Sequence, residues 1–138
     1  MSTAPTATAR YLGQLRTEAT HVASGTVIQT DAPVDNHGRG EAFSPTDLVC
    51  TALATCIVTT MAIVAERRTV GLEGATFAVT KHMSTAPPRR IAAIDVHLTL
   101  PAALDATERS ILERAAHTCP VSLSLHPDVV QNLVFAYR

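Results

Sequence analysis

The sequence predicts an α+β fold in which antiparallel, strand-rich segments pack on one long, buried central helix. Leu48 to Ala65 carries no charged residue, as expected for a helix buried on every side. Ile91 to Leu100 alternates apolar and polar side chains, the pattern of a strand with one buried face. Asp105 and Glu108 have the spacing of a helix capping box. These segments predict the element order ββ-α-ββ-α-β, with helices packed on sheet.

The N-terminal part predicts a hairpin followed by one long loop. Tyr11 to His21 and Gly25 to Thr30 contain β-branched residues and flank the turn signal Ala23-Ser24-Gly25. Asp31 to Phe43 is rich in residues that favour turns and that can hold polar side chains over a cavity. Residues 1–9 are small and polar. We expect them to form a flexible tail before a single domain over residues 10–138.

Start and stop signals bound the central helix. Ser44 can cap its N-terminus, Pro45 suits the first helical position, and Asp47 places a carboxylate in the first turn. Arg67 and Arg68 suit the negative end of the helix dipole. The run is just long enough for a membrane span. In a chain of balanced charge, however, a helix that is apolar all round is more simply a core helix, so no membrane insertion is predicted.

The C-terminal part predicts a second sheet that a helix and a short turn interrupt. The expected strands are Ala75–Met83, Ile91–Leu100 and Val129–Tyr137. A helix follows Asp105, with its apolar side chains on one side. Pro120 should end or redirect this helix, and Val121–Leu125 could form a short helical turn before the last strand.

Composition excludes several classes of partner. The 138 residues include eleven Lys and Arg against twelve Asp and Glu, so bulk charge favours neither nucleic acid nor an anionic membrane. The N-terminal residues lack the basic and apolar regions of a secretory signal. We expect a protein of the reducing cytoplasm, where paired thiols are catalytic or redox-active rather than structural.

Two cysteines are candidates for this chemistry, although core packing would explain each one singly. Cys56 lies deep within the central helix, where burial would raise its pKa and leave it inert unless a cation is close. Arg16 on the first strand and Arg39 in the long loop are the candidate cations. Cys119 precedes Pro120 and can cap the following turn, so local electrostatics predict that Cys119 is the more acidic thiol.

The remaining reactive side chains give weaker signals. Cys50 is more than half a turn from Cys56 around the helix and is expected in the core. His117 and His126 could join Cys119 at a metal, but their spacing matches no usual zinc pattern and a fourth ligand is missing. His117 could also serve a Cys-His hydrolase, for which no orienting acid is evident. We therefore predict no metal and no cofactor.

Four motifs occur in a specific order along the chain. They are Ser44-Pro45-Thr46-Asp47-Leu48, Ala52-Leu53-Ala54-Thr55-Cys56, Ala116-His117-Thr118-Cys119-Pro120-Val121-Ser122 and Leu125-His126-Pro127-Asp128. Together they resemble the OsmC/Ohr family, named for osmotic induction and organic hydroperoxide resistance, and the match is closest to its general OsmC-like branch. The resemblance implies an OsmC-like fold and an intertwined homodimer, in which the central helices pack together and each sheet is completed by the partner.

The resemblance also implies a thiol-dependent peroxidase for organic hydroperoxides. Cys56 would then attack and Cys119 would resolve the product as a disulfide, the reverse of the local estimate of acidity. An external dithiol would reduce that disulfide. The alternative from the same resemblance is an OsmC-like dimer that binds a small apolar ligand with little or no peroxidase turnover.

One position departs from the family pattern. Family peroxidases place a glutamate directly after the proline of the helix start, where it positions the activating arginine, and Thr46 occupies that site here. Asp47 or Glu41 could substitute, although Asp47 has its own explanation as a helix cap. Of the two arginines, Arg39 is preferred because its loop leads directly into the helix that carries Cys56.

Overall fold

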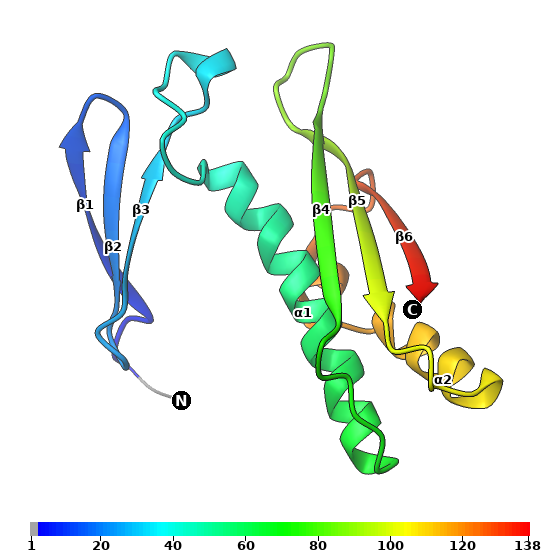
Figure 1. The fold of residues 1–138 in the computed structure, drawn as a ribbon. Helices are drawn as coiled ribbons and strands as arrows, with labels where there is room; N and C mark the ends of the chain where they lie inside the picture. Colours follow the sequence, from blue (N-terminus) through cyan, green and yellow to red (C-terminus); the bar gives the residue numbers. More distant parts are fainter. Residues whose placement is uncertain (1–2) are drawn as a thin grey trace. The chain divides into compact units, whose positions relative to one another are not determined.

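The computed structural model describes residues 3–138 and has an α+β architecture with two three-stranded sheets (Figure 1). The chain divides into two compact units, one that ends at Leu48 and one that runs from Val49 to Arg138. The predicted domain over residues 10–138 therefore spans both units. Of the predicted tail, residues 1 and 2 lie outside the described residues, and the first strand already begins at Ala7.

The N-terminal unit contains an antiparallel sheet of three strands, one more than predicted. In sheet order these strands are β1 (Ala7–Gly13), β2 (Arg16–His21) and β3 (Val27–Asp31). The predicted strand Tyr11–His21 is interrupted by a tight turn in which Gly13, Gln14 and Leu15 all have positive φ. Gln14 and Leu15 rarely adopt this conformation, so the sequence gives little signal for the turn.

The loop after β3 is shaped by a short helix and a glycine. The 3-10 helix η1 (Val34–Asn36) lies in its first half. A Cβ atom on Gly38 would lie 1.7 Å from the carbonyl oxygen of Ala32, so a larger residue does not fit there. Glu41 then donates its backbone N–H to Asp31 at 3.0 Å. The loop thus returns to the end of β3.

The central helix α1 (Pro45–Arg67) begins and ends where the sequence predicts. Ser44 Oγ accepts the Asp47 backbone N–H at 3.0 Å, and the Ser44 N–H donates to Asp47 Oδ2 at 3.0 Å, which completes a capping box. Within residues 3–138, α1 is the one helix whose length and composition would allow it to cross a membrane. Its buried residues are Cys50, Leu53, Ala54, Ile57, Met61 and Ala65, which confirms Cys50 as a core residue.

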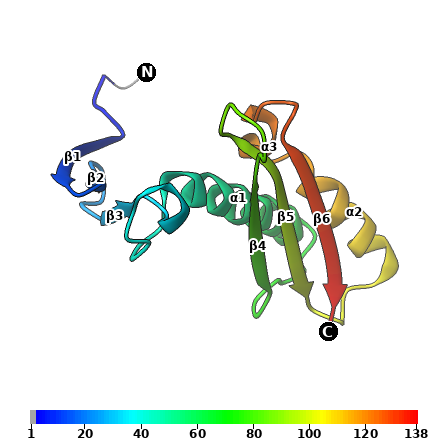
Figure 2. The ribbon, with the colours of Figure 1, turned by 90° about the horizontal axis from the view of Figure 1, so that it is seen from above.

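The C-terminal unit packs helices on one face of a mixed sheet. Its strands, in sheet order, are β4 (Thr76–Met83), β5 (Ile91–Leu100) and β6 (Val130–Tyr137). β4 and β5 pair antiparallel as predicted, whereas β5 and β6 pair in parallel, so the prediction of purely antiparallel sheets is wrong for this pair. Parallel pairing requires a crossover, which the helices α2 (Ala106–Ala116) and α3 (Pro120–Ser124) supply. Figure 2 shows α1 and α2 on the same side of this sheet.

The local signals around α2 and α3 are confirmed. Asp105 Oδ1 accepts the Glu108 N–H at 2.8 Å, and Glu108 Oε1 accepts the Asp105 N–H at 3.0 Å. Pro120 is the first residue of α3, and Cys119 is its N-cap. The chain therefore changes direction where the sequence places a proline.

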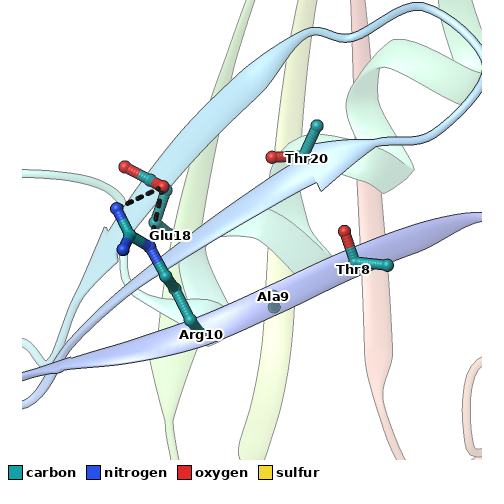
Figure 3. Close-up of a pocket in the computed structure, with 5 residues that line it drawn as sticks. All are labelled: Thr8, Ala9, Arg10, Glu18 and Thr20. Carbon is teal, nitrogen blue, oxygen red and sulfur yellow. Dashed lines mark hydrogen bonds and ion pairs between the residues drawn. The ribbon is translucent and has the colours of Figure 1, made fainter.

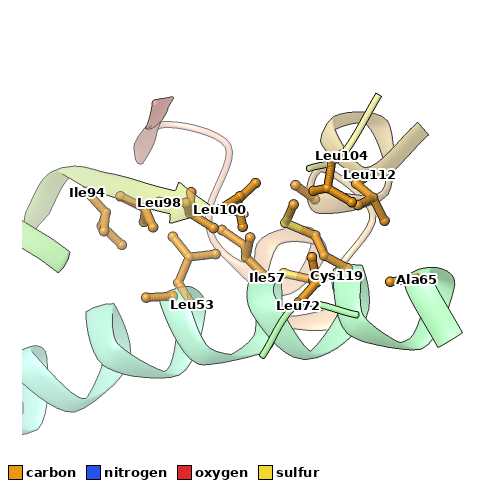
Figure 4. Close-up of a cluster of buried hydrophobic side chains, with 14 of the residues drawn as sticks. Leu53, Ile57, Ala65, Leu72, Ile94, Leu98, Leu100, Leu104, Leu112 and Cys119 are labelled. Atoms are coloured by element: carbon orange, nitrogen blue, oxygen red, sulfur yellow. The ribbon is translucent and has the colours of Figure 1, made fainter. Parts of the chain in front are cut away.

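The apolar core belongs to the C-terminal unit. Figure 4 shows side chains of α1, β5 and α2 meeting in it, including Leu53, Ile57, Ile94, Leu98, Leu100 and Leu112. Among residues 3–48, by contrast, the buried residues are Thr30, Asp31 and Ser44, all of them polar. The N-terminal sheet therefore has no apolar core of its own within the described residues.

Candidate active site

The two candidate cysteines lie together in the C-terminal unit. Cys56, on α1, is half-buried, and Cys119, at the N-cap of α3, is 0% exposed. The Cys56 side chain lies close enough to Cys119 to raise the pKa of the Cys119 thiol. Cys50 is also a free thiol but is fully buried in the core. The two thiols are therefore neighbours, one on α1 and the other at the start of α3.

Burial dominates the electrostatics of Cys119. It raises the pKa of the Cys119 thiol above its ordinary value, and the neighbouring Cys56 side chain raises the pKa further. The Ser122 backbone N–H donates to Cys119 Sγ at 3.3 Å and acts in the opposite direction. The prediction that helix capping makes Cys119 acidic is therefore wrong, because the cap is present but burial outweighs it.

Cys56 lies at the border between the buried and exposed sides of α1. Positions three or four residues apart share one side of a helix, and Cys56 shares a side with uncharged, exposed residues. These residues, here called the exposed strip of α1, are Val49, Ala52, Thr59 and Ile63. A dissolved substrate can therefore reach Cys56 more readily than Cys119.

Arg16 and Asp31 form a bidentate ion pair in the N-terminal unit. They are direct cross-strand neighbours on β2 and β3. Arg16 Nε donates to Asp31 Oδ1 at 2.7 Å, and Arg16 Nη2 donates to Asp31 Oδ2 at 2.8 Å. The Asp31 side chain is 1% exposed, against 26% for Arg16. The hydrogen bond from Arg16 holds the pKa of Asp31 below its ordinary value, and the Glu41 backbone N–H adds to this effect.

Glu41 and Arg39 lie beside this pair with looser contacts. Glu41 Oε1 is 3.8 Å from Arg16 Nη2 and 3.9 Å from Arg39 Nη1. The side chains of Arg39 and Glu41 are 50% and 60% exposed, so solvent screens their attraction. Of the two candidate arginines, Arg16 is thus the one that a carboxylate holds in a defined orientation.

Asp47 and Thr46 take part in the cap of α1. Asp47 binds the backbone of Ser44, and Thr46 Oγ1 lies 3.2 Å from Ser44 Oγ. The carboxylate that binds an arginine, Arg16, is instead that of Asp31. The sequence analysis did not select Asp31, because it assigned this residue to the long loop. A signal was available, because pairing the two strands outward from the hairpin turn places Asp31 opposite Arg16.

The candidate residues thus fall into two groups, each within one unit. Arg16, Arg39 and Glu41 cluster around Asp31 in the N-terminal unit, and Cys56 pairs with Cys119 in the C-terminal unit. A surface hollow of about 170 Å³ on β1 and β2 contains none of the candidates (Figure 3); its lining residues are Thr8, Ala9, Arg10, Glu18 and Thr20. Among residues 3–138, no group of three or more His, Cys, Asp or Glu side chains could hold a metal ion.

Comparison with known proteins identifies the family. The family model of the OsmC-like proteins matches residues 38–133, which include Cys56 and Cys119. The chain belongs to the OsmC-like protein family. This result confirms the resemblance found in the four sequence motifs.

Solved structures support the same assignment. A candidate osmotic stress induced and detoxification response protein from Psychrobacter arcticus 273-4 is 43% identical, with a TM-score of 0.92 and 98% of each chain covered. An organic hydroperoxide resistance protein OsmC from Legionella pneumophila is 20% identical, with a TM-score of 0.75, covering 98% of this chain and 99% of that one.

A third structure comes from Vibrio cholerae O1 biovar eltor str. N16961. It is a candidate organic hydroperoxide resistance protein with captopril bound in one of its active sites. It is 18% identical, with a TM-score of 0.73, and the match covers 98% of this chain and 94% of that one. At this level of identity the likeness establishes the OsmC-like fold. A search of curated proteins found no match.

Proposed function

We propose that this protein is a thiol-dependent peroxidase that reduces organic hydroperoxides. The observation that carries the proposal is that the half-exposed Cys56 thiol and the buried Cys119 thiol are neighbours. Two thiols in contact can give two electrons to a substrate and end as a disulfide. The relatives named for organic hydroperoxide resistance support the class of substrate.

The chemistry proceeds in two balanced steps. The Cys56 thiolate attacks the terminal oxygen of the hydroperoxide, the O–O bond breaks, and the alkoxide takes a proton and leaves as an alcohol. Cys56 is now a sulfenic acid. The Cys119 sulfur then attacks the Cys56 sulfur, and the departing hydroxide combines with the Cys119 proton to form water. An external dithiol reduces the resulting disulfide by thiol–disulfide exchange.

Exposure and acidity support these roles for the two thiols. The half-exposed Cys56 is the thiol that a hydroperoxide can reach, whereas Cys119 is fully buried in the core. Because burial raises the pKa of Cys119, that thiol stays protonated and does not compete as a nucleophile. Its burial and its raised pKa therefore leave Cys119 as an unreacted thiol that is present for the second step.

An arginine is proposed to stabilise the Cys56 thiolate, as the family resemblance implies. The bidentate contact with Asp31 supports Arg16 over Arg39, because a guanidinium held by two hydrogen bonds loses less conformational freedom when it acts. In this proposal Asp31 takes the orienting role of the family glutamate that Thr46 replaces. Arg16→Lys should slow the hydroperoxide reaction about tenfold or more, since lysine cannot make the paired contact. Arg39→Lys is the matched control and should react at the wild-type rate.

The proposal includes a homodimer. The N-terminal sheet lacks an apolar core among its described residues and exposes large hydrophobic side chains, among them Tyr11, Val27 and Ile28. A three-stranded sheet needs a covered apolar face for stability. The exposed strip of α1 is likewise uncharged. A second copy of the chain could cover both surfaces.

The decisive experiment measures consumption of cumene hydroperoxide with dithiothreitol as reductant. Wild type should turn over, and Cys56→Ser should show no thiol-dependent consumption. Without dithiothreitol, Cys119→Ser should consume one equivalent rapidly and then accumulate a sulfenic acid that dimedone traps. Cys50→Ala, which removes a core thiol outside the pair, should retain turnover.

Absence of thiol-dependent consumption by wild type would overturn the peroxidase proposal. It would favour the alternative of a small-ligand-binding dimer. The specific observation behind that alternative is Thr46, whose hydroxyl lies beside the helix cap where family peroxidases carry an acid. Binding of an apolar ligand without turnover, followed by calorimetry, would distinguish the two functions.

A further inference from the structure

The orientation of α3 depends on its contacts with the rest of the unit. A helix of five residues, Pro120–Ser124, is too short to be stable alone. Leu123 is 73% exposed, so one side of α3 faces solvent. Val121 and Leu125 pack partly against the core. Because Cys119 is the N-cap residue, the position of its sulfur is tied to this short element.

One polar side chain fixes α3 to the sheet. Ser122 Oγ donates to Gln131 Oε1 at 2.6 Å, and Gln131 Nε2 donates to the Ser122 carbonyl oxygen at 3.2 Å. Gln131 lies on β6 in register with the fully buried Ile94. The acceptor oxygen and the donor nitrogen of the Gln131 amide therefore both bond to a single residue of α3.

The same residue of α3 contacts the reactive sulfur. The Ser122 backbone N–H donates to Cys119 Sγ at 3.3 Å. A continuous series of contacts thus runs from the amide of Gln131 through Ser122 to the thiol of Cys119. At the far end of the series, Cys119 lies next to Cys56.

We propose that Gln131 is a positioning residue that holds Cys119, through Ser122, in the geometry needed for disulfide formation with Cys56. The inference rests on the proposed function for the resolving role of Cys119. A disulfide forms within narrow limits of distance and dihedral angle, so rotation of α3 by a fraction of a turn removes Cys119 from line with Cys56. Gln131 acts on this second step and leaves the first step, at the half-exposed Cys56, unaffected.

The effect of losing Gln131 should be kinetic more than structural. The apolar contacts of Val121 and Leu125 keep α3 on the core in its absence. What is lost is the restriction on rotation and the fixed direction of the Ser122 N–H donor. Loss of two neutral hydrogen bonds should slow disulfide formation about tenfold.

The test compares four variants with wild type in a Cys50→Ala background, which limits the reactive thiols to the pair. Gln131→Met keeps the length of the side chain without its hydrogen bonds, and Ser122→Ala removes the hydroxyl from the other side. Gln131→Met and Ser122→Ala are also combined. Asn132→Leu is the matched control, because the adjacent residue uses its amide on Asp95, at 2.8 Å, instead of on α3.

Two rates are measured separately after mixing with one equivalent of cumene hydroperoxide. Gln131→Met should form the sulfenic acid at the wild-type rate, form the disulfide about tenfold more slowly, and give a larger dimedone-trapped fraction. The double variant should be no slower than Gln131→Met, because Gln131→Met already removes the hydrogen bond that Ser122→Ala removes. The control should match wild type in both steps. Thermal unfolding followed by circular dichroism verifies that each variant is folded.

Disulfide formation at the wild-type rate in Gln131→Met would contradict the inference, as would equal slowing of both steps. If wild type does not consume the hydroperoxide, the proposed function fails, and oxidation by diamide then decides the inference. In that reaction the two thiols lose two electrons and two protons to diamide and become the disulfide. Slower diamide oxidation in Gln131→Met than in the control supports the positioning role, and equal rates overturn it.

Discussion

Asp31 holds a negative charge in a nearly solvent-free position because Arg16 pairs with it in a bidentate geometry. A buried charge without a partner is strongly destabilising, so neither residue can be replaced at random. The pair also gives the N-terminal unit a polar centre in place of an apolar core. At the scale of single residues, this ion pair is therefore a structural element as well as a candidate part of the active site.

Stability should consequently fall at acidic pH through Asp31. The pKa of Asp31 is lowered in the folded protein, chiefly by the hydrogen bond from Arg16. Such a carboxyl stabilises the fold above its unfolded pKa of about 3.9, and the stabilisation is lost as pH falls through the folded value. At neutral pH the free energy of unfolding of wild type should therefore exceed that of the Asp31→Asn variant. The difference between the two proteins should shrink below about pH 4.

Urea unfolding over a pH series measures this difference. Asp128→Asn is the control, since the Asp128 side chain is 73% exposed, and it should stay close to wild type throughout. A difference between wild type and Asp31→Asn that is constant down to about pH 3 would contradict the assignment.

Single residues also mark how much of the site could be predicted. Cys56 and Cys119 could be selected as candidate residues from the sequence, because each lies in a short motif of neighbouring residues. The acidity of Cys119 was misjudged, since local capping is visible in sequence whereas burial depends on the whole core. The contact of Asp31 with Arg16 depends on the register of two strands, so it can be predicted only by pairing those strands outward from the hairpin turn.

At the scale of elements, the helices were the most predictable. Their caps and prolines are local signals, and α1, α2 and α3 begin where those signals lie. The turn between β1 and β2 was not predictable, because Gln14 and Leu15 adopt positive φ without the usual sequence marker. The parallel pairing of β6 with β5 was also not foreseen, because it follows from the crossover rather than from either strand.

The capping box of α2 provides a test at this scale. Asp105→Ala removes the acceptor of the Glu108 N–H and should lower the free energy of unfolding by about 1 kcal/mol. Asp105→Ser, which restores an acceptor at the N-cap, should recover most of the loss. Chemical denaturation measures both variants, and equal stability of Asp105→Ala and wild type would count against a structural role for this cap.

At the scale of the whole molecule, the two units differ in what stabilises them. The C-terminal unit has a continuous apolar core, and the described part of the N-terminal unit buries polar residues while exposing large apolar ones. In the proposed homodimer, a second copy of the chain would cover these exposed apolar side chains. The relatives of known structure establish the fold of the chain, and the dimer stays a prediction.

Substitution within the exposed strip of α1 tests the dimer. Ile63 is 47% exposed, and Ile63→Glu should shift dimer to monomer at micromolar concentration, because a charge in an apolar helix contact is costly to desolvate. Leu123→Glu, at an exposed position on α3, is the control and should leave the mass unchanged. Light scattering measures the mass, and a monomeric wild type would end the proposal.

The burial of Cys119 bears on how long the protein would survive in the hydroperoxide that is proposed as its substrate. A sulfenic acid that waits in excess peroxide is carried on to sulfinic and sulfonic acids, which thiols do not reverse. On the proposed chemistry, the sulfenic acid at Cys56 already has as its neighbour the Cys119 thiol, which is 0% exposed. The first oxidation is then intercepted before a second can occur, so the enzyme should lose activity slowly even when hydroperoxide greatly outnumbers it.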